Sequence, residues 1–221
     1  SSCYVERRDK LARGGALDGA GKRAAFALFY GPQHFLITRE IMRAIGPAPH
    51  TRVIDLGCGT GSAGSAVALE TGGAVIEGCD LHPWAVREAN WTYDMFGLRG
   101  RATIANIVKA RIDAASGALV LAAYAVNELA AEARGPLLDR LKAAHIRGAS
   151  ILVIEPIGRR TNLWWPGWTE AFTAAGGRDD DWRFRVPLPP RQRLLAKGAG
   201  LDPQELTARS LYLPGTLSLS E

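Results

Sequence analysis

The chain has 221 residues, enough for one domain with a full hydrophobic core and too few for two comfortable ones. Its net charge of +5 and isoelectric point of about 9.4 are compatible with an anionic partner such as nucleic acid, and equally with a mildly basic enzyme. No apolar run approaches the ~20 residues that span a bilayer, and residues 1–10 lack the apolar core of a signal peptide, so we expect a cytoplasmic protein with no membrane partner.

The first part of the chain is predicted to be helical. Ala24–Phe29 is an apolar stretch of good helix formers, and Gly31-Pro32 is expected to break it. Thr38 can cap a second helix over Arg39–Ile45, which ends at Gly46.

Short apolar strands then alternate with helices. We expect strands at Arg52–Leu56, Ala74–Cys79, Ala102–Ile107, Ala118–Ala123 and Ser150–Ile154, and helices at Ser62–Thr71, Trp84–Met95 and Glu132–Ala144. This spacing predicts βαβ units in an α/β fold, with a mostly parallel sheet and helices on both faces.

The pattern changes after Glu155. Trp182–Leu188 and Leu206–Leu213 are strand-like, and the segment between them is basic and rich in proline. We predict an antiparallel C-terminal hairpin at the sheet edge, which gives about seven strands. The whole chain is expected to form one compact domain, with residues 1–46 as an N-terminal helical segment and 47–221 as the main domain. Basic residues crowd this last third: Arg159, Arg160, Arg178, Arg183, Arg185, Arg191, Arg193 and Lys197.

The most specific motif is the glycine turn in Val53–Gly61, which reads VIDLGCGTG. Glycines between a strand and a helix let the backbone approach a ligand closely, and the helix terminus presents free N–H groups. A dinucleotide site carries G-x-G-x-x-G, whose third glycine would stand where Ser62 is found. A nicotinamide dehydrogenase is therefore disfavoured.

This turn resembles the D-x-G-x-G-x-G motif of class I methyltransferases, which implies their Rossmann-like fold and S-adenosylmethionine as the cofactor. The resemblance implies that Asp55 holds the loop and the methionine amino group, and that Gly57, Cys58, Gly59 and Gly61 pack against the amino-acid part of the cofactor. A plain structural turn is the alternative.

Asp80 ends the second predicted strand and can accept hydrogen bonds from both ribose hydroxyls, as acids at this place do in dinucleotide folds. Its alternative role is to cap the following helix. By analogy with the family, Leu81 lies near the adenine. Asn106 stands where the family often has an acid near the adenine amino group, and so departs from that pattern.

The methyl acceptor is expected beyond the carboxyl ends of the fourth and fifth strands, where ligands bind in open α/β sheets. Tyr124, Asn127, Glu128 and Glu155 are the polar candidates for aligning the acceptor or taking its proton. The alternative for Tyr124 and Asn127 is a purely structural role, in a loop or as the cap of a helix. Amino methylation of bases typically uses an N/D-P-P-Y/F motif, which is missing, and no cysteine is present for C5 methylation of cytosine.

The chain also resembles a narrower family, the small-ribosomal-subunit assembly methyltransferases of mitochondria and their bacterial relatives. The matching segments are Ala123–Leu129, Ile154–Pro156, Asp181–Pro189, Lys197-Gly198 and Ser210–Leu213. This resemblance implies binding to RNA of the small ribosomal subunit, with or without methylation.

Metal sites are not expected. The four histidines are scattered, and the three cysteines contain no C-x-x-C pair. Many members of the ribosomal family carry cysteines suited to an iron–sulfur cluster after the fifth strand. Here no cysteine follows Cys79, so we expect no cluster.

Three functions stay open at this point: methylation of RNA, methylation of a small molecule on oxygen or nitrogen, and assembly of ribosomes with cofactor binding but no turnover. The tryptophans of the basic region fit either view, because they can stack on unpaired bases or cover the core. They are Trp164, Trp165, Trp168 and Trp182.

Overall fold

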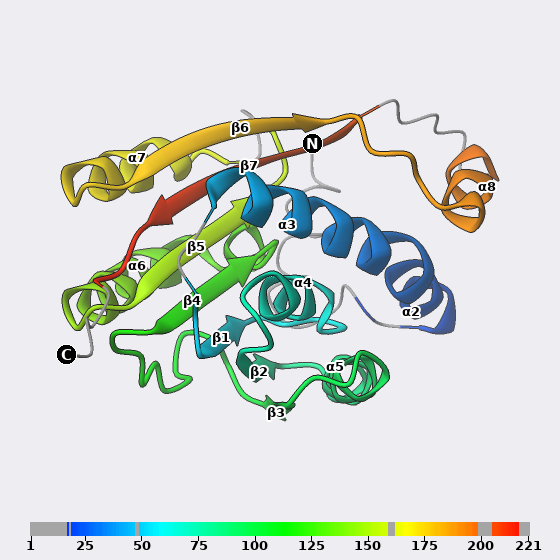
Figure 1. Cartoon of the computed structure of the whole chain (residues 1–221), viewed down its shortest axis with the longest axis horizontal. Helices are drawn as coiled ribbons and strands as arrows, with labels where there is room; N and C mark the ends of the chain where they lie inside the picture. Colours follow the sequence, from blue (N-terminus) through cyan, green and yellow to red (C-terminus); the bar gives the residue numbers. More distant parts are fainter. Residues whose placement is uncertain (1–16, 18, 47–48, 159–161, 199–204, 217–221) are drawn as a thin grey trace.

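A computed structural model describes residues 17, 19–46, 49–158, 162–198 and 205–216. Seven strands form one sheet in the order β3-β2-β1-β4-β5-β7-β6 (Figure 1). The strands are β1 (Arg52–Leu56), β2 (Val75–Asp80), β3 (Gly100–Ile104), β4 (Ala118–Ala123), β5 (Ser150–Glu155), β6 (Arg178–Phe184) and β7 (Leu206–Leu213). The first five are parallel, and β7 runs antiparallel to both β5 and β6. The expected sheet with its antiparallel C-terminal hairpin is confirmed.

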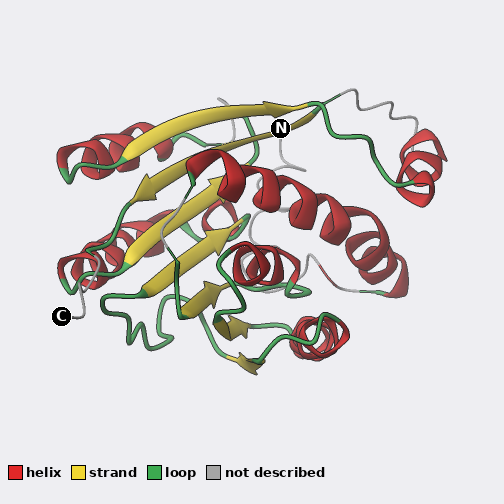
Figure 2. Ribbon diagram, viewed as in Figure 1, coloured by secondary structure: helices red, strands yellow, loops and turns green. Residues whose placement is uncertain are grey.

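Helices cover both faces of this sheet (Figure 2). On one face lie α3 (Gly31–Ile45), α4 (Ser62–Glu70) and α5 (Pro83–Met95), which pack on strand residues such as Val53 and Leu121. On the other face lie α6 (Ala131–Ile146) and α7 (Trp165–Ala174), which pack on Ile54 and Val120. Successive strand residues point to opposite faces, so buried strands with apolar residues at every position supply two hydrophobic cores.

The expected helix break at Gly31-Pro32 is wrong. The chain continues from α2 (Ala20–Ala25) through a π-helical turn, η2 (Phe26–Tyr30), into α3. Pro32 stands in the first turn of α3, where its missing N–H is tolerated. The carbonyl four residues earlier, that of Leu28, accepts a hydrogen bond from the Gln192 side chain. Thr38 is fully buried within α3 and caps no helix.

The C-terminal region holds two helices that the sequence did not predict, α7 and α8 (Pro190–Gly198). Each has a proline in its first residues, a position where a helix tolerates it, and the sequence pattern predicted no helix for either segment. The strand expected at Trp182–Leu188 starts four residues earlier, as β6. Its acidic residues are tolerated because β6 is an edge strand, and Arg209 of β7 lies 3.5–3.7 Å from Asp179 and Asp181.

Other boundaries shift by a few residues. β3 ends at Ile104 rather than Ile107, because Asn106 opens a turn in which its side chain accepts the Val108 N–H at 2.9 Å. Among the described residues, no helix is long and apolar enough to cross a membrane. The division of the chain at residue 46 stays a prediction, and Arg159 and Arg160 lie outside the described residues.

Candidate active site

The glycine turn joins β1 to α4 and is pinned to the neighbouring strand. The N–H groups of Gly57 and Cys58 both donate to the Cys79 carbonyl, at 2.9 Å each. Gly57, Gly59 and Gly61 have φ values of 74°, 52° and 74°, a left-handed conformation that side chains rarely adopt. The sequence therefore places glycine where this turn needs it.

Close packing adds a second reason for these glycines. A Cβ at Gly57 would lie 2.7 Å from the Ala125 Cβ, and one at Gly61 would lie 2.7 Å from the Tyr93 ring. At Gly59 a Cβ would come within 3.1 Å of the Phe26 ring, which belongs to η2. The turn is thus a bare backbone surface with an aromatic ring lying over it.

Asp80 stands at the end of β2 and supports the turn from the side. Its Oδ2 accepts the Gly59 N–H at 3.0 Å, and its Oδ1 accepts the His82 N–H at 2.8 Å. The cap of α5 is His82, whose Nδ1 accepts the Trp84 N–H. Asp80 is partly exposed and borders the cavity, so its carboxylate can accept further hydrogen bonds from a ligand.

Asp55 lies beneath the turn and is almost completely buried, at 1% exposure. Burial raises the pKa of its carboxyl to about 7, and the negative charge of Asp80 adds to that rise, whereas the Gly64 N–H lowers the pKa. A Cβ at Gly64 would lie 2.4 Å from the Asp55 Oδ2, so α4 approaches this carboxyl through a glycine. Asp55 is thus held by close packing against α4 and by the hydrogen bond from the Gly64 N–H.

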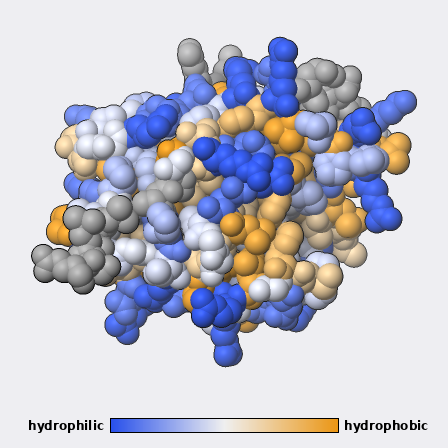
Figure 3. All heavy atoms as spheres, viewed as in Figure 1, coloured by the Kyte–Doolittle hydropathy of each residue, from blue (hydrophilic) through white to orange (hydrophobic). Residues whose placement is uncertain are grey.

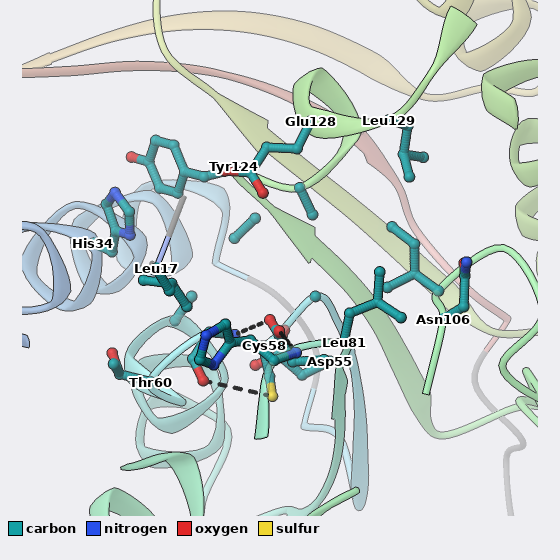
Figure 4. Close-up of a pocket in the computed structure, with 18 of the residues that line it drawn as sticks. Leu17, His34, Asp55, Cys58, Thr60, Leu81, Asn106, Tyr124, Glu128 and Leu129 are labelled. Carbon is teal, nitrogen blue, oxygen red and sulfur yellow. Dashed lines mark hydrogen bonds between the residues drawn. The ribbon is translucent and has the colours of Figure 1, made fainter. Parts of the chain in front are cut away.

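A cavity of about 260 Å³ opens beside the turn and gathers most of the residues expected at the site (Figure 4). Figure 4 shows Tyr124, Glu128 and Leu129 along one side and Asp55, Cys58 and Thr60 along the other. The expected residues that line the cavity are Asp55, Gly57, Cys58, Gly59, Asp80, Leu81, Asn106, Tyr124 and Glu128. Gly61, Asn127 and Glu155 are not among its lining residues, and Gly61 instead begins α4.

The thiol of Cys58 is a packed group rather than a nucleophile. It is 6% exposed, and burial raises its pKa well above the usual range. Burial also raises the pKa of Cys79 to about 11. Thiols held neutral in this way are poor nucleophiles.

Tyr124 follows β4 in a left-handed conformation, with φ of 58°. Its ring stacks on His34 of α3, with the ring centroids 3.8 Å apart and the planes inclined by 9°. Burial lowers the pKa of His34 to about 4 and raises that of Tyr124 above its usual range. Both rings are therefore neutral at physiological pH.

Glu128 completes this side of the cavity from the 3₁₀ turn η3 (Val126–Glu128). Glu128 is an exposed residue, and its side chain borders the cavity. Desolvation of its carboxyl by the neighbouring protein, with the charge of Asp80, raises the pKa of Glu128 to about 7. A carboxyl with a pKa near neutrality can exchange a proton in either direction at working pH.

Asn127 and Glu155 hold the turn that carries Glu128, from outside the cavity lining. The Asn127 N–H and side-chain amide donate to the two Glu155 oxygens at 3.0 and 2.9 Å. The same amide donates to Asn162, and the Trp164 indole donates to the Asn127 Oδ1 at 2.7 Å. Arg134 reaches the carbonyls of the loop at Val126, Asn127 and Leu129. Burial raises the pKa of Glu155 to about 8. These contacts hold Asn127 and Glu155 against each other, and neither is among the lining residues of the cavity.

Leu17, Phe26 and His34 are among the cavity residues that were not predicted from the sequence. All three come from the N-terminal segment, whose pattern predicts only helix. His34 belongs to no motif in the sequence that would indicate a functional role. Only the fold shows that it lies against Tyr124 at the end of β4.

The tryptophans mostly cover the core, as one of the two alternatives had it. Trp165 and Trp168 are 1% and 4% exposed on α7. Trp164 is held by Asn127, and Trp182 donates to the Ser210 hydroxyl at 2.8 Å. Trp164 and Trp182 are partly exposed.

The lining chemistry fits S-adenosylmethionine. The cofactor carries a cationic sulfonium and a ribose, and the cavity offers the carboxyls of Asp55, Asp80 and Glu128 beside apolar walls at Leu81 and Ile107. Within the described part of the chain, no lysine or arginine lines the cavity, so it lacks the cation that a phosphate-bearing cofactor would favour. The same part of the chain holds no group of three or more potential metal ligands.

Comparisons with known proteins agree with this site. Residues 37–122 match the sequence profile of the methyltransferase small domain. The plantazolicin methyltransferase BpumL, solved in complex with SAH, has the same fold: TM-score 0.55, 12% identity, 96% of this chain and 97% of that chain covered. A TehB-like SAM-dependent methyltransferase from Corynebacterium glutamicum aligns with a TM-score of 0.51 and 16% identity, over 97% of each chain. A putative RNA methyltransferase, PH1948 from Pyrococcus horikoshii, aligns with a TM-score of 0.53 and 14% identity, over 83% of each chain.

No match is found among curated proteins. The matched segment, the shared fold and the cavity together support a SAM-dependent methyltransferase with S-adenosylmethionine as its cofactor. The solved structures share the fold with this chain, and their substrates differ from one another.

Proposed function

We propose that this methyltransferase acts on RNA, in particular RNA of the small ribosomal subunit. The observation that carries the proposal is a basic helix beside the cavity. On α8, Arg191, Arg193 and Lys197 are all exposed. This helix packs on η2 through the bond from Gln192 to the Leu28 carbonyl, and Phe26 of η2 lines the cavity.

The arginines of β6 are less suited to RNA than those of α8. Arg178 pairs with Asp180 at 2.6 Å, and Arg183 and Arg185 both approach Glu205, at 3.7 and 3.2 Å. Within the described residues, Arg191 and Arg193 of α8 have no ion pair. Unpaired cations release more counterions on binding phosphates, so the RNA surface is assigned to α8 and not to β6.

The surface at this end of the molecule is mixed (Figure 3). Hydrophilic side chains protrude around apolar ones at the end that carries α2 and α8. Leu194 of α8 is 71% exposed, and Tyr30 of η2 is 48% exposed. An exposed aromatic ring beside cations is the combination that holds an unpaired base.

In this proposal the residues expected from the sequence keep their roles. Asp80 accepts the ribose hydroxyls, Leu81 and Asn106 border the adenine, and Asp55 with the turn from Gly57 to Gly61 holds the methionine part. A substrate in the small ribosomal subunit would place the protein in the cytoplasm.

The test compares two double variants with the same change of charge. Arg191→Glu with Arg193→Glu alters α8, and Arg99→Glu with Arg101→Glu alters exposed arginines at the start of β3, the opposite end of the strands. For a single-stranded RNA oligonucleotide, loss of two phosphate contacts should reduce the slope of log K against log salt by about 1.4 in the α8 variant. Fluorescence anisotropy at several salt concentrations measures it. Equal slopes in the two variants would contradict the assignment.

Turnover is tested by transfer of a labelled methyl group to small-subunit ribosomal RNA and, separately, to a metabolite extract. Label in the RNA supports the proposal. Label in the extract alone supports a small-molecule methyltransferase, which the cover of Leu17 and Phe26 over the cavity also favours. Binding of cofactor and RNA with no label in either pool would indicate an assembly factor without turnover.

A further inference from the structure

Three polar side chains face the cavity on the side away from the glycine turn. They are His34, Tyr124 and Glu128 (Figure 4). None of the three side chains hydrogen-bonds another described residue, although each borders the cavity. His34 and Tyr124 are partly buried and Glu128 is exposed, so water in the cavity can solvate their polar atoms. A bound group can take the place of that water and hydrogen-bond to the same atoms of this wall.

The wall is rigid before any ligand arrives. Tyr124 is fixed by the bond from its N–H to the Ile154 carbonyl at 2.7 Å and by the stack on His34. Tyr124 has a left-handed φ of 58°, a strained conformation for a residue other than glycine that persists only where the surroundings impose it and that is common at active sites. Behind Glu128, Asn127 and Arg134 hold the loop.

The charge of this cavity selects the kind of group that can enter. The acids that line it are Asp55, Asp80 and Glu128, its other ionisable lining residues are His34, Cys58, His82 and Tyr124, and no lysine or arginine from the described chain joins them. At the wall formed by His34, Tyr124 and Glu128, a carboxylate or phosphate would lie beside the Glu128 carboxylate with no lysine or arginine to offset the repulsion. A neutral group that donates hydrogen bonds would meet acceptors at the Glu128 carboxylate and an imidazole nitrogen.

We propose that His34, Tyr124 and Glu128 form the acceptor subsite, and that it takes a neutral amino or hydroxyl group and rejects carboxylates. The inference rests on the proposed methyltransferase function and specifies its acceptor. The lone pair of the acceptor nitrogen or oxygen forms the new bond to the methyl carbon, and the pair of the breaking carbon–sulfur bond stays on sulfur. The proton leaving the acceptor passes to the Glu128 carboxylate.

The test uses three planar fragments that differ in one group: aniline, phenol and benzoate. Their affinities are measured by ligand-observed NMR, with and without saturating S-adenosylhomocysteine. We expect aniline and phenol to bind at least tenfold more tightly than benzoate. Benzoate binding as tightly as aniline would overturn the inference.

Two variants locate the effect. Glu128→Gln keeps the side-chain shape without the charge, so benzoate should gain roughly tenfold relative to aniline. His34→Phe keeps a ring against Tyr124 but removes both nitrogens, so aniline should weaken several-fold. Glu132→Gln, an exposed acid of α6 outside the cavity lining, is the matched control and should change neither value. Fragment preferences that are the same in all four proteins would refute the subsite.

Product analysis separates this inference from the RNA proposal. Label on an exocyclic amine or a ribose hydroxyl of RNA supports both. Label on a base carbon would overturn the subsite and leave RNA methylation standing. Label on an amine or hydroxyl of a metabolite, with none in RNA, would support the subsite and overturn the RNA proposal.

Discussion

Replacing Asp80 by alanine separates cofactor binding from support of the fold. Its carboxylate already accepts the N–H groups of Gly59 and His82, at 3.0 and 2.8 Å. Hydrogen bonds to a charged group contribute about 1.5–3 kcal/mol each. Because Asp80 is partly exposed, water can replace much of that, and we expect a loss of stability of about 1–2 kcal/mol in total. At ~2–4 °C per kcal/mol for a chain of this size, the melting temperature should fall by about 2–8 °C.

The loss of cofactor affinity should be larger. If both ribose hydroxyls donate to this carboxylate, the variant loses two charge-assisted bonds, worth about 2–4 kcal/mol after replacement by water. At 1.4 kcal/mol per factor of ten, the dissociation constant should rise roughly 30- to 1,000-fold. Asp80→Asn keeps one acceptor oxygen and should fall between alanine and the wild type.

Calorimetric titration with S-adenosylhomocysteine measures the affinity, with NADH as the comparison ligand, and thermal unfolding measures the stability. The control is Glu77→Ala, an exposed acid on the same strand that pairs with Arg52. An Asp80→Ala protein that binds S-adenosylhomocysteine within threefold of the wild type would refute the ribose assignment. Tight binding of NADH by the wild type would refute the cofactor.

Two further predictions concern the network behind the cavity. Glu155 has a pKa of about 8 when folded, so between its unfolded value near 4.5 and pH 8 the native state holds a proton that the unfolded chain has released. Stability should therefore fall as pH rises through this window, by up to ~1.4 kcal/mol per pH unit. Melting temperatures from pH 5 to 8.5 should show a shallower slope in Glu155→Gln, and an unchanged slope would contradict the shift. Trp164→Phe leaves the Asn127 Oδ1 without its donor, which should cost about 1–2 kcal/mol of unfolding free energy by denaturant titration. S-adenosylhomocysteine affinity should not change, and Trp91→Phe, at an exposed position, should change neither.

The sheet was predictable because its strands are short, apolar and spaced by helices. β1, β4 and β7 match their expected bounds, since strands buried on both faces leave continuous apolar runs. The glycine turn was predictable for a related reason. A left-handed φ and a packed Cβ position both require glycine. The glycines in the sequence therefore indicate the conformation of the turn.

The helices that begin with proline were not predictable by the same rules. In the sequence, Gly31-Pro32 and the start of α7 look like helix breaks. In the structure, Gly31-Pro32 follows the π-helical turn η2 and begins α3, and Pro166 lies in the first turn of α7. At η2 the tertiary contact is the Gln192 side chain, 164 residues away in the chain. No local pattern contains that information.

The site was predictable in part. Tyr124 and Glu128 border the cavity, whereas Asn127 and Glu155 bind each other outside its lining. Asn127 and Glu128 are consecutive residues of the 3₁₀ turn η3, and the sequence does not show which of the two side chains borders the cavity. His34 could be recognised only after the fold placed α3 against the end of β4.

The acidic cavity and the basic helix constrain each other. An RNA backbone cannot enter a cavity bordered by Asp55, Asp80 and Glu128, because no described cation there would offset the phosphates. It can lie along α8, which is outside the cavity and packs on its cover. Under the proposed RNA function, the acceptor is then a single base or sugar that leaves the strand and enters the cavity alone, carrying a neutral amino or hydroxyl group. Unstacking costs least in single strands and loops, so the same geometry predicts that the α8 surface prefers unpaired RNA to duplex.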